Sequence, residues 1–417
     1  MFCWQSCRRY APSTNLKVFF AAGKQNLNAQ LKIISFLPHH GSSISGGERS
    51  FFEILKRWAR WGNQIHVVTT KEGYSLLKRQ GLRFFPHIYD FPETISSLSW
   101  YWCVERAMRK IPHDRFDFVY SNEPFTSVIP AFVAKNKTKA PLVVVFKALG
   151  PHESNLTSCY RSCRAHAQRT ILGSAIYSTF VLLRNMLARR ADLLLIVSSY
   201  YKELLTEMDM NPNRIYTVRH GVNFTHISSI KVDDSKSFDA CFMGSLNPQK
   251  GIFDLVQAWK KVIDKKPDAK LVIIGTGKKV VVEQLNKLIL KLNLDKNIIQ
   301  TGWLYDEKFK VMKKSKIFAF PSYGEGFALA VCEAMACGLP VVAYDLPAYK
   351  SVYRKGMITV RTGDVQELAN ALIDILEDES SQKKLGRDAI EQAKEYDWEN
   401  SARAQLDIIT KFLQITK

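Results

Sequence analysis

Two glutamates, Glu325 and Glu333, stand in the segment of this chain that carries the most chemical information. Residues 321–340 read PSYGEGFALAVCEAMACGLP and follow a short apolar strand, and residues 327–337 are typical of a helix. The start of such a helix offers backbone N–H groups to an anion such as a diphosphate, and Gly326 allows the backbone to approach a ligand closely. A carboxylate in this loop is a poor phosphate ligand but a good acceptor for sugar hydroxyls. The combination indicates a site for a nucleotide-sugar.

This segment resembles the signature of the family-four glycosyltransferases, which are retaining enzymes of the GT-B fold. In that family two glutamates separated by seven residues precede a small-Gly-x-Pro turn into a buried strand. Here residues 337–340 read CGLP and Val-Val-Ala follows. Two glutamates at this spacing are weak evidence alone, because many helices carry them, but the flanking residues make the pattern specific. The alternative is a solvated helix in which both glutamates are incidental.

The resemblance implies a role for each part of the site. Glu333 would bind the ribose hydroxyls of the donor, and Glu325 would bind the hydroxyls of its sugar. The donor diphosphate would lie between the backbone N–H groups of Gly326 and Phe327, a glycine loop formed by Gly46 and Gly47, and a loop that contains Gly244, Ser245 and Lys250.

Residues 244–251 depart from the family at one position. They follow an expected buried strand at Phe238–Met243, and ligands bind at the carboxyl ends of strands in such sheets. The family usually has Gly-Arg-Leu there, followed by Lys-Gly, and its arginine and lysine neutralise the diphosphate. Lys250 matches the lysine, but Ser245 occupies the arginine position, and a serine hydroxyl brings no charge. A different basic residue could compensate for it.

A histidine is the second catalytic candidate beside Glu325. The family commonly has a histidine near the reacting sugar, after the strand equivalent to Leu142–Phe146. Lys147 takes roughly that place here, and His152 follows five residues later. The alternative for a lone loop histidine is a polar surface role. Retention in the family is described as same-face attack without a protein nucleophile, so Glu325 is not assigned as one. The chain contains no Asp-x-Asp, and we expect no metal and no other cofactor.

Strands and helices alternate along the chain, which predicts parallel sheets covered by helices. The 417 residues are too many for one compact core and suit two domains. Together with the resemblance, this predicts the GT-B fold, in which two Rossmann-like α/β domains face each other across a cleft. The expected boundaries are a poorly ordered extension at 1–30, an acceptor-side domain at 31–222, a linker at 223–237, a nucleotide-sugar-binding domain at 238–397, and a last helix at 398–415 that packs back on the first domain.

The net charge of +20 suggests an anionic partner. Residues 154–190 contain six arginines (161, 164, 169, 184, 189 and 190) and no acidic residue, with apolar residues between them. This pattern fits a basic amphipathic helix on anionic lipid, and it fits a core-packing helix with solvated arginines equally well. No recognised nucleic-acid motif accompanies the charge, so we expect no nucleic-acid partner.

The function predicted from these observations is a retaining glycosyltransferase. It would move a hexose-type sugar from a nucleotide-diphospho-sugar to a lipid-linked, glycan or small-molecule acceptor, with a lipid-linked or anionic acceptor favoured by the charge. Eight cysteines without a CxxC pair fit a reducing cytoplasm, and a peripheral place on the cytoplasmic face of a membrane is compatible. Two alternatives stay open: another GT-B enzyme such as a sugar-nucleotide epimerase, and a non-catalytic basic scaffold that binds lipid or nucleic acid.

Overall fold

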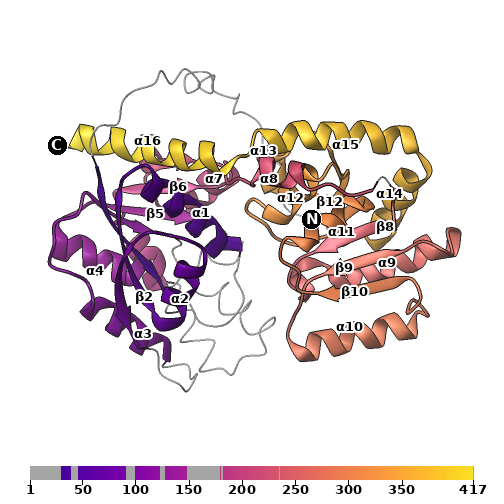
Figure 1. Cartoon of the computed structure of the whole chain (residues 1–417), viewed down its shortest axis with the longest axis horizontal. Helices are drawn as coiled ribbons and strands as arrows, with labels where there is room; N and C mark the ends of the chain where they lie inside the picture. The colour runs from indigo at the N-terminus through magenta and orange to yellow at the C-terminus, as the bar shows by residue number, and fades with distance from the viewer. Residues whose placement is uncertain are drawn as a thin grey trace, which may run out of the picture.

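A computed structural model describes residues 30–38, 46–90, 99–122, 127–147, 179, 182–233 and 235–416. The predicted N-terminal extension, apart from residue 30, lies outside these residues, and so does most of the arginine-rich segment. Two α/β domains lie side by side in Figure 1, and the described part of the chain crosses between them twice.

The N-terminal domain is built on a seven-stranded parallel sheet with the order β3-β2-β1-β4-β5-β6-β7. The central strands β4, β5 and β6 are buried along their whole length, as expected for a parallel sheet with helices on both faces. The strands are β1 Lys32–Leu37, β2 Gln64–Thr70, β3 Phe85–Tyr89, β4 Phe118–Ser121, β5 Leu142–Phe146, β6 Leu193–Ile196 and β7 Ile215–Thr217. The helices are α1 Gly46–Arg60, α2 Lys71–Arg79, α3 Ser99–Arg109, α4 Val128–Thr138 and α7 Tyr200–Glu207.

The C-terminal domain is built on a six-stranded parallel sheet with the order β10-β9-β8-β11-β12-β13. Its strands are β8 Phe238–Met243, β9 Leu271–Ile274, β10 Ile298–Gly302, β11 Ser315–Phe320, β12 Val341–Tyr344 and β13 Met357–Val360. Its helices are α9 Ile252–Lys265, α10 Lys279–Lys291, α11 Glu307–Lys313, α12 Leu329–Ala336, α13 Pro347–Val352, α14 Val365–Glu377 and α15 Glu379–Lys394. The prediction of two parallel α/β domains is therefore confirmed.

Three local expectations differ from the structure. Gly46 and Gly47 form the first turn of α1 instead of a loop before it. Residues 224–237 were expected to be irregular, but Phe224–Ser229 form helix α8, whose start is capped because the Asn223 side chain accepts from the backbone N–H of His226. Helix α12 begins two residues later than expected, because Ala328 has a positive φ of 58° and cannot continue a right-handed helix.

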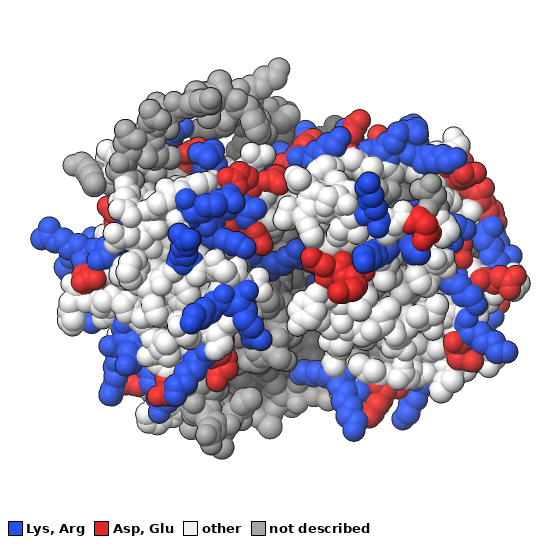
Figure 2. Space-filling view, viewed as in Figure 1, with Lys and Arg blue, Asp and Glu red and all other residues white. Residues whose placement is uncertain are grey.

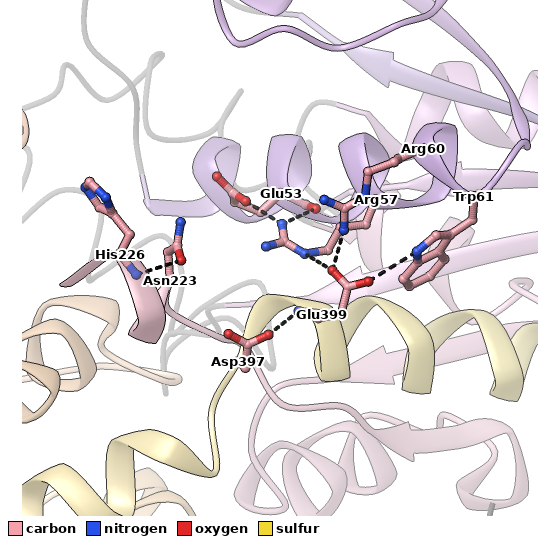
Figure 3. Close-up of polar contacts among 8 residues, drawn as sticks. All are labelled: Glu53, Arg57, Arg60, Trp61, Asn223, His226, Asp397 and Glu399. Atoms are coloured by element: carbon pink, nitrogen blue, oxygen red, sulfur yellow. Dashed lines mark hydrogen bonds and ion pairs between the residues drawn. The ribbon is translucent and has the colours of Figure 1, made fainter. Parts of the chain in front are cut away.

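The last helix, α16 Trp398–Thr416, packs on α1 of the N-terminal domain (Figure 1). The indole N–H of Trp58 donates to the backbone carbonyl of Ala402 at 2.9 Å, in the buried interface. At its edge, the carboxylate of Glu399 binds the side chains of Arg57, Arg60 and Trp61, as Figure 3 shows. The C-terminal end of the chain thus returns to the first domain.

The two crossings between the domains touch each other. The backbone N–H of Val222 donates to the carbonyl of Tyr396 at 3.1 Å, and Val222 forms an isolated parallel bridge with Asp397. A Cβ at Gly221 would lie 2.4 Å from the backbone nitrogen of Trp398, so only glycine fits there. The connection between the domains therefore consists of two chain segments that contact each other.

The surface carries charges of both signs. In the view of Figure 2, lysines and arginines are spread over both domains and interspersed with aspartates and glutamates. None of the helices in the described part of the chain is long and apolar enough to cross a bilayer.

Candidate active site

The loop between β11 and α12 holds the first signature glutamate. The hydroxyl of Ser322, which is fully buried, donates to Oε1 of Glu325 at 2.8 Å. Nζ of Lys250 lies 2.5 Å from the same oxygen. Both contacts use Oε1, so the other carboxylate oxygen of Glu325 can still accept hydrogen bonds from a ligand hydroxyl.

The second signature glutamate is buried on α12. Glu333 is 3% exposed, and Nζ of Lys308 lies 2.9 Å from each of its carboxylate oxygens. The guanidinium of Arg49, on α1 of the other domain, also contacts Oε1. Burial alone would raise the pKa of Glu333, but the charges of Arg49 and then Lys308 outweigh it and hold this pKa below its ordinary value. Glu333 is therefore ionised at neutral pH.

The two domains meet at the loop between β11 and α12, the signature loop. A Cβ at Gly326 would lie 2.1 Å from the backbone carbonyl oxygen of Lys147 and 2.7 Å from the hydroxyl of Tyr201, both in the N-terminal domain. A Cβ at Gly46 would lie 3.5 Å from a methyl group of Leu329, the first residue of α12. The starts of α1 and α12 therefore face each other across the domain boundary, and each presents N–H groups that lack partners within its own helix.

Lys147, which directly follows strand β5, contacts the start of α1 at this junction. Its ammonium group donates to the carbonyl of Gly47 at 2.8 Å and also contacts the side-chain oxygen of Asn122. The position where the family commonly has a histidine thus holds a cation beside the start of α1. His152 lies outside the described residues, so its role stays a prediction.

A buried histidine that the sequence did not single out for the site lies beneath the same junction. Nδ1 of His220 is 3.1 Å from the hydroxyl of Ser50, and its ring packs edge-on against Phe327 with the ring centroids 5.4 Å apart. Burial first, and then the charge of Lys147, lower the pKa of His220 well below its ordinary value. The ring is therefore neutral and takes part in packing, as does the buried side chain of Phe327.

The loop after β8 supplies close backbone packing. The N–H of Gly244 donates to the carbonyl of Ile274 at 3.0 Å, and a Cβ at Gly275 would lie 1.9 Å from the carbonyl oxygen of Gly244. The amide N–H of Gly244 is thus already used within the protein. Ser245 is exposed, and its hydroxyl accepts a hydrogen bond from the side-chain amide of Asn247 at 2.8 Å.

Gly251 brings Lys250 against the signature loop. It has a positive φ of 67°, and a Cβ on it would lie 1.9 Å from the carbonyl oxygen of Pro321. This approach explains how Lys250 reaches Glu325, although 75 residues separate them. The structure therefore gathers seven of the predicted site residues at the junction of α1 and α12: Gly46, Gly47, Lys250, Glu325, Gly326, Phe327 and Glu333.

Two cations of this site were not among the predicted residues. Arg49 lies three residues after the first glycine of α1, and Lys308 lies in the first turn of α11. The only signal for Arg49 was its nearness to the glycine pair, and nothing in the local sequence distinguished Lys308 from the many other lysines. The arrangement as a whole can bind sugar hydroxyls at two ionised or ion-paired carboxylates and an anion between two helix starts.

Comparison with solved structures identifies the fold. The chain superimposes on solved structures of GT-B glycosyltransferases, which confirms the predicted fold. HepE of Anabaena, solved in complex with UDP and glucose, has a TM-score of 0.71 and 17% sequence identity, over 92% of this chain and all of HepE.

The sequence also matches two family models. The family model for "Glycosyl transferases group 1" matches residues 224–394, and that for "Glycosyltransferase Family 4" matches residues 44–226. The chain belongs to the family-four glycosyltransferases, as the signature segment had indicated.

Two named relatives span most of the chain. Sulfoquinovosyl transferase SQD2 of Arabidopsis thaliana is 24% identical over 404 residues, which cover 90% of this chain and 72% of that protein. The N-acetylgalactosamine-N,N'-diacetylbacillosaminyl-diphospho-undecaprenol 4-alpha-N-acetylgalactosaminyltransferase of Campylobacter jejuni is 26% identical over 300 residues, which cover 70% of this chain and 74% of that protein.

Proposed function

We propose that this protein is a retaining glycosyltransferase that moves a hexose-type sugar from a nucleotide-diphospho-sugar to an acceptor. The observation that carries the proposal is the buried, ionised Glu333 on α12, together with the Lys250–Glu325 pair in the loop before the same helix. A carboxylate has about four lone-pair positions, so beside its contacts with Lys308 and Arg49 Glu333 can accept a hydrogen bond from a ribose hydroxyl. Family membership supports the same assignment.

The donor would lie along α12. Its ribose would bind Glu333, its diphosphate the N–H groups of Gly326 and Phe327 together with Lys250, and its sugar the free oxygen of Glu325. The first turn of α1, with Gly46 and Gly47, would approach the diphosphate from the other domain. UDP is the first nucleotide to test, because HepE was solved with it.

The chemistry would consist mainly of positioning and charge stabilisation. The bond between the sugar C1 and the phosphate oxygen breaks, the acceptor oxygen attacks C1 from the same face, and its proton passes to the leaving phosphate oxygen. Lys250 and the helix N–H groups stabilise the negative charge that develops on the leaving diphosphate. Because protein cations supply this charge, we expect turnover without a metal. Glu325 orients the sugar, and His152 stays the further catalytic candidate.

The acceptor is proposed to be lipid-linked or otherwise anionic. The net charge of +20 favours an anionic acceptor, and the name of the Campylobacter relative contains a diphospho-undecaprenol. Such an acceptor would bring the protein to the cytoplasmic face of a membrane as a peripheral protein. Flotation with vesicles of anionic and of neutral lipid tests this part, and equal binding to both would remove it.

A thermal-shift screen tests the donor site. The purified protein is heated with UDP, GDP, ADP and their sugar conjugates in the presence of a chelator. Ligand at about 100 times its dissociation constant stabilises the folded state by about 2.7 kcal/mol, which a melting curve resolves. We expect a shift with one nucleotide and its loss in Glu333→Ala and Lys250→Ala, whereas Lys56→Ala, an exposed site on α1, keeps it. No shift with any nucleotide would contradict the proposal.

A further inference from the structure

One cation at Glu333 is in excess. The single negative charge of this buried carboxylate meets two positive charges, those of Arg49 and Lys308. Of the other carboxylates within electrostatic reach of Arg49, Glu53 pairs with Arg57, whereas Asp306, which contacts His226, acts on both Arg49 and Lys308 from a greater distance. Two cations that share one buried carboxylate leave one of them available to an anionic ligand.

Arg49 is the cation that can leave. Lys308 belongs to the same domain as Glu333, contacts both of its oxygens and has a side chain that is 13% exposed. Arg49 comes from the other domain, contacts one oxygen and has a side chain that is 32% exposed. If Arg49 moves away, Lys308 still pairs with Glu333, so the buried carboxylate does not lose its only partner.

The proposed diphosphate site, where an additional cation would stabilise the ligand, is at the start of α12 and faces the first turn of α1. Arg49 is in the first turn of α1, whose first residue, Gly46, faces Leu329 at the start of α12. Glu333 follows Leu329 by four residues, which is about 6 Å along a helix axis. Gly326 and Phe327 come two to three residues before Leu329, so a guanidinium at Glu333 has to move by about 10 Å to reach their N–H groups, along the boundary that α1 and α12 share.

The C-terminal domain provides one cation fewer at this place than the family usually does. Ser245 is exposed, carries no charge and has its hydroxyl engaged by Asn247. Lys250 is the cation that this loop contributes, and it pairs with Glu325. A donor with two phosphates would meet a single cation from this loop.

We propose that Arg49 is a ligand of the donor diphosphate, supplied across the domain boundary in place of the charge that Ser245 lacks. Ribose hydroxyls take the carboxylate of Glu333, the guanidinium of Arg49 leaves it, and the planar guanidinium then binds phosphate oxygens with two N–H groups. Arg49 would couple closure of the two domains to donor binding. The inference rests on the proposed donor site and adds a specificity for diphosphate over a bare nucleoside.

The test compares a nucleoside diphosphate with its nucleoside. Affinities for UDP are measured by calorimetry, with GDP and ADP in parallel, and uridine is measured by competition against UDP. The proteins are wild type, Arg49→Ala, the double variant Arg49→Ala with Ser245→Arg, and Lys56→Ala as the matched loss of an exposed charge on α1.

Loss of a charge-assisted hydrogen bond corresponds to a change in affinity of about tenfold to a hundredfold. We expect Arg49→Ala to weaken UDP by this factor and to regain UDP affinity when Ser245→Arg is added. Uridine should bind as tightly as to the wild type or more tightly, because its ribose no longer has to displace Arg49 from Glu333. Lys56→Ala binds both ligands as wild type does.

The competing explanation is that Arg49 only ties the domains together through Glu333. In that case Arg49→Ala would change the UDP and uridine affinities by the same factor, or would tighten both, and the inference would be overturned while the donor site stands. If the wild type binds none of the three nucleoside diphosphates, the proposed donor site itself falls, and this inference falls with it.

Discussion

Gly326 is the position where one methyl group should separate the two domains. In the structure its Cα faces the backbone of the N-terminal domain so closely that a Cβ would lie 2.1 Å from the carbonyl oxygen of Lys147. The same Cβ would lie 2.7 Å from the hydroxyl of Tyr201. The Tyr201 side chain is buried, and the Lys147 carbonyl directly follows the buried strand β5, so relief of the contact requires the loop and the N-terminal domain to shift apart.

The size of the effect follows from these distances. The shortest ordinary C–H···O contacts are about 3.3 Å, so Gly326→Ala requires the loop and the Lys147 carbonyl to move apart by about 1.2 Å. Overpacking of this kind costs about 1–3 kcal/mol, which falls on the closed arrangement of the domains because each domain can keep its own core. If the donor binds this arrangement, its affinity should fall by roughly fivefold to 150-fold.

Gly324→Ala provides the matched control. Gly324 lies two residues earlier in the same loop, and a Cβ there would meet nothing within 4 Å. Calorimetric titration with the nucleotide that binds the wild type should show the loss in Gly326→Ala and wild-type affinity in Gly324→Ala. Equal, unchanged affinities in both variants would refute the reasoning, because the close approach of Gly326 to Lys147 would then have no part in donor binding.

Three further predictions concern stability and are read from urea unfolding. Lys308→Met should lower the free energy of unfolding by about 1.5–3 kcal/mol, because it removes a charged hydrogen-bond donor from buried Glu333; an unchanged value would contradict this. His220 has a folded-state pKa below the unfolded one, so only the unfolded chain binds its proton between them. Stability should fall below about pH 6.5, by up to about 1.4 kcal/mol per unit, and His220→Asn should lessen this slope. Ala328→Gly should stabilise by about 0.5–1 kcal/mol, because the positive φ suits glycine; destabilisation would argue against strain there.

The sequence predicted best what is encoded locally. Strands β5 and β6 read LVVVF and LLLI, continuous apolar runs that a parallel sheet buries on both faces. The edge strand β3 reads FPHIY and is partly exposed. Because it contains a proline and no continuous apolar run, its sequence does not indicate a strand. Helix α8 did have a signal, the capping side chain of Asn223, but the polar residues around it were taken for an irregular linker.

The signature carboxylates could be located from the sequence because their spacing and their flanking turn lie in one segment. The partners of those carboxylates could not. Glu333 is held by Lys308 from α11 and by Arg49 from the other domain, 284 residues away along the chain. Such pairs exist only once the domains have packed, and a lone arginine or lysine in a basic chain gives no indication of them.

The glycines also differ in whether their positions could be predicted from the local sequence or depend on tertiary contacts. The pair Gly46 and Gly47 could be recognised, but not that it lies inside α1, because glycine usually disfavours helices. Gly244 was expected to bind the donor, and the structure shows its N–H engaged by a neighbouring strand. Its closeness to Gly275 is a tertiary contact between two loops, which neither loop reveals alone.

The central claim is that α12 and the loop before it hold and activate a nucleotide-sugar. The most direct test is the release of nucleoside diphosphate from a panel of UDP-, GDP- and ADP-sugars by the purified protein with chelator present, with and without lipid-linked acceptors. The account predicts release from donors of one base, strongly reduced in Glu325→Gln and nearly abolished in Glu333→Ala. Release from none of the donors, or release that survives unchanged in Glu333→Ala, would contradict it.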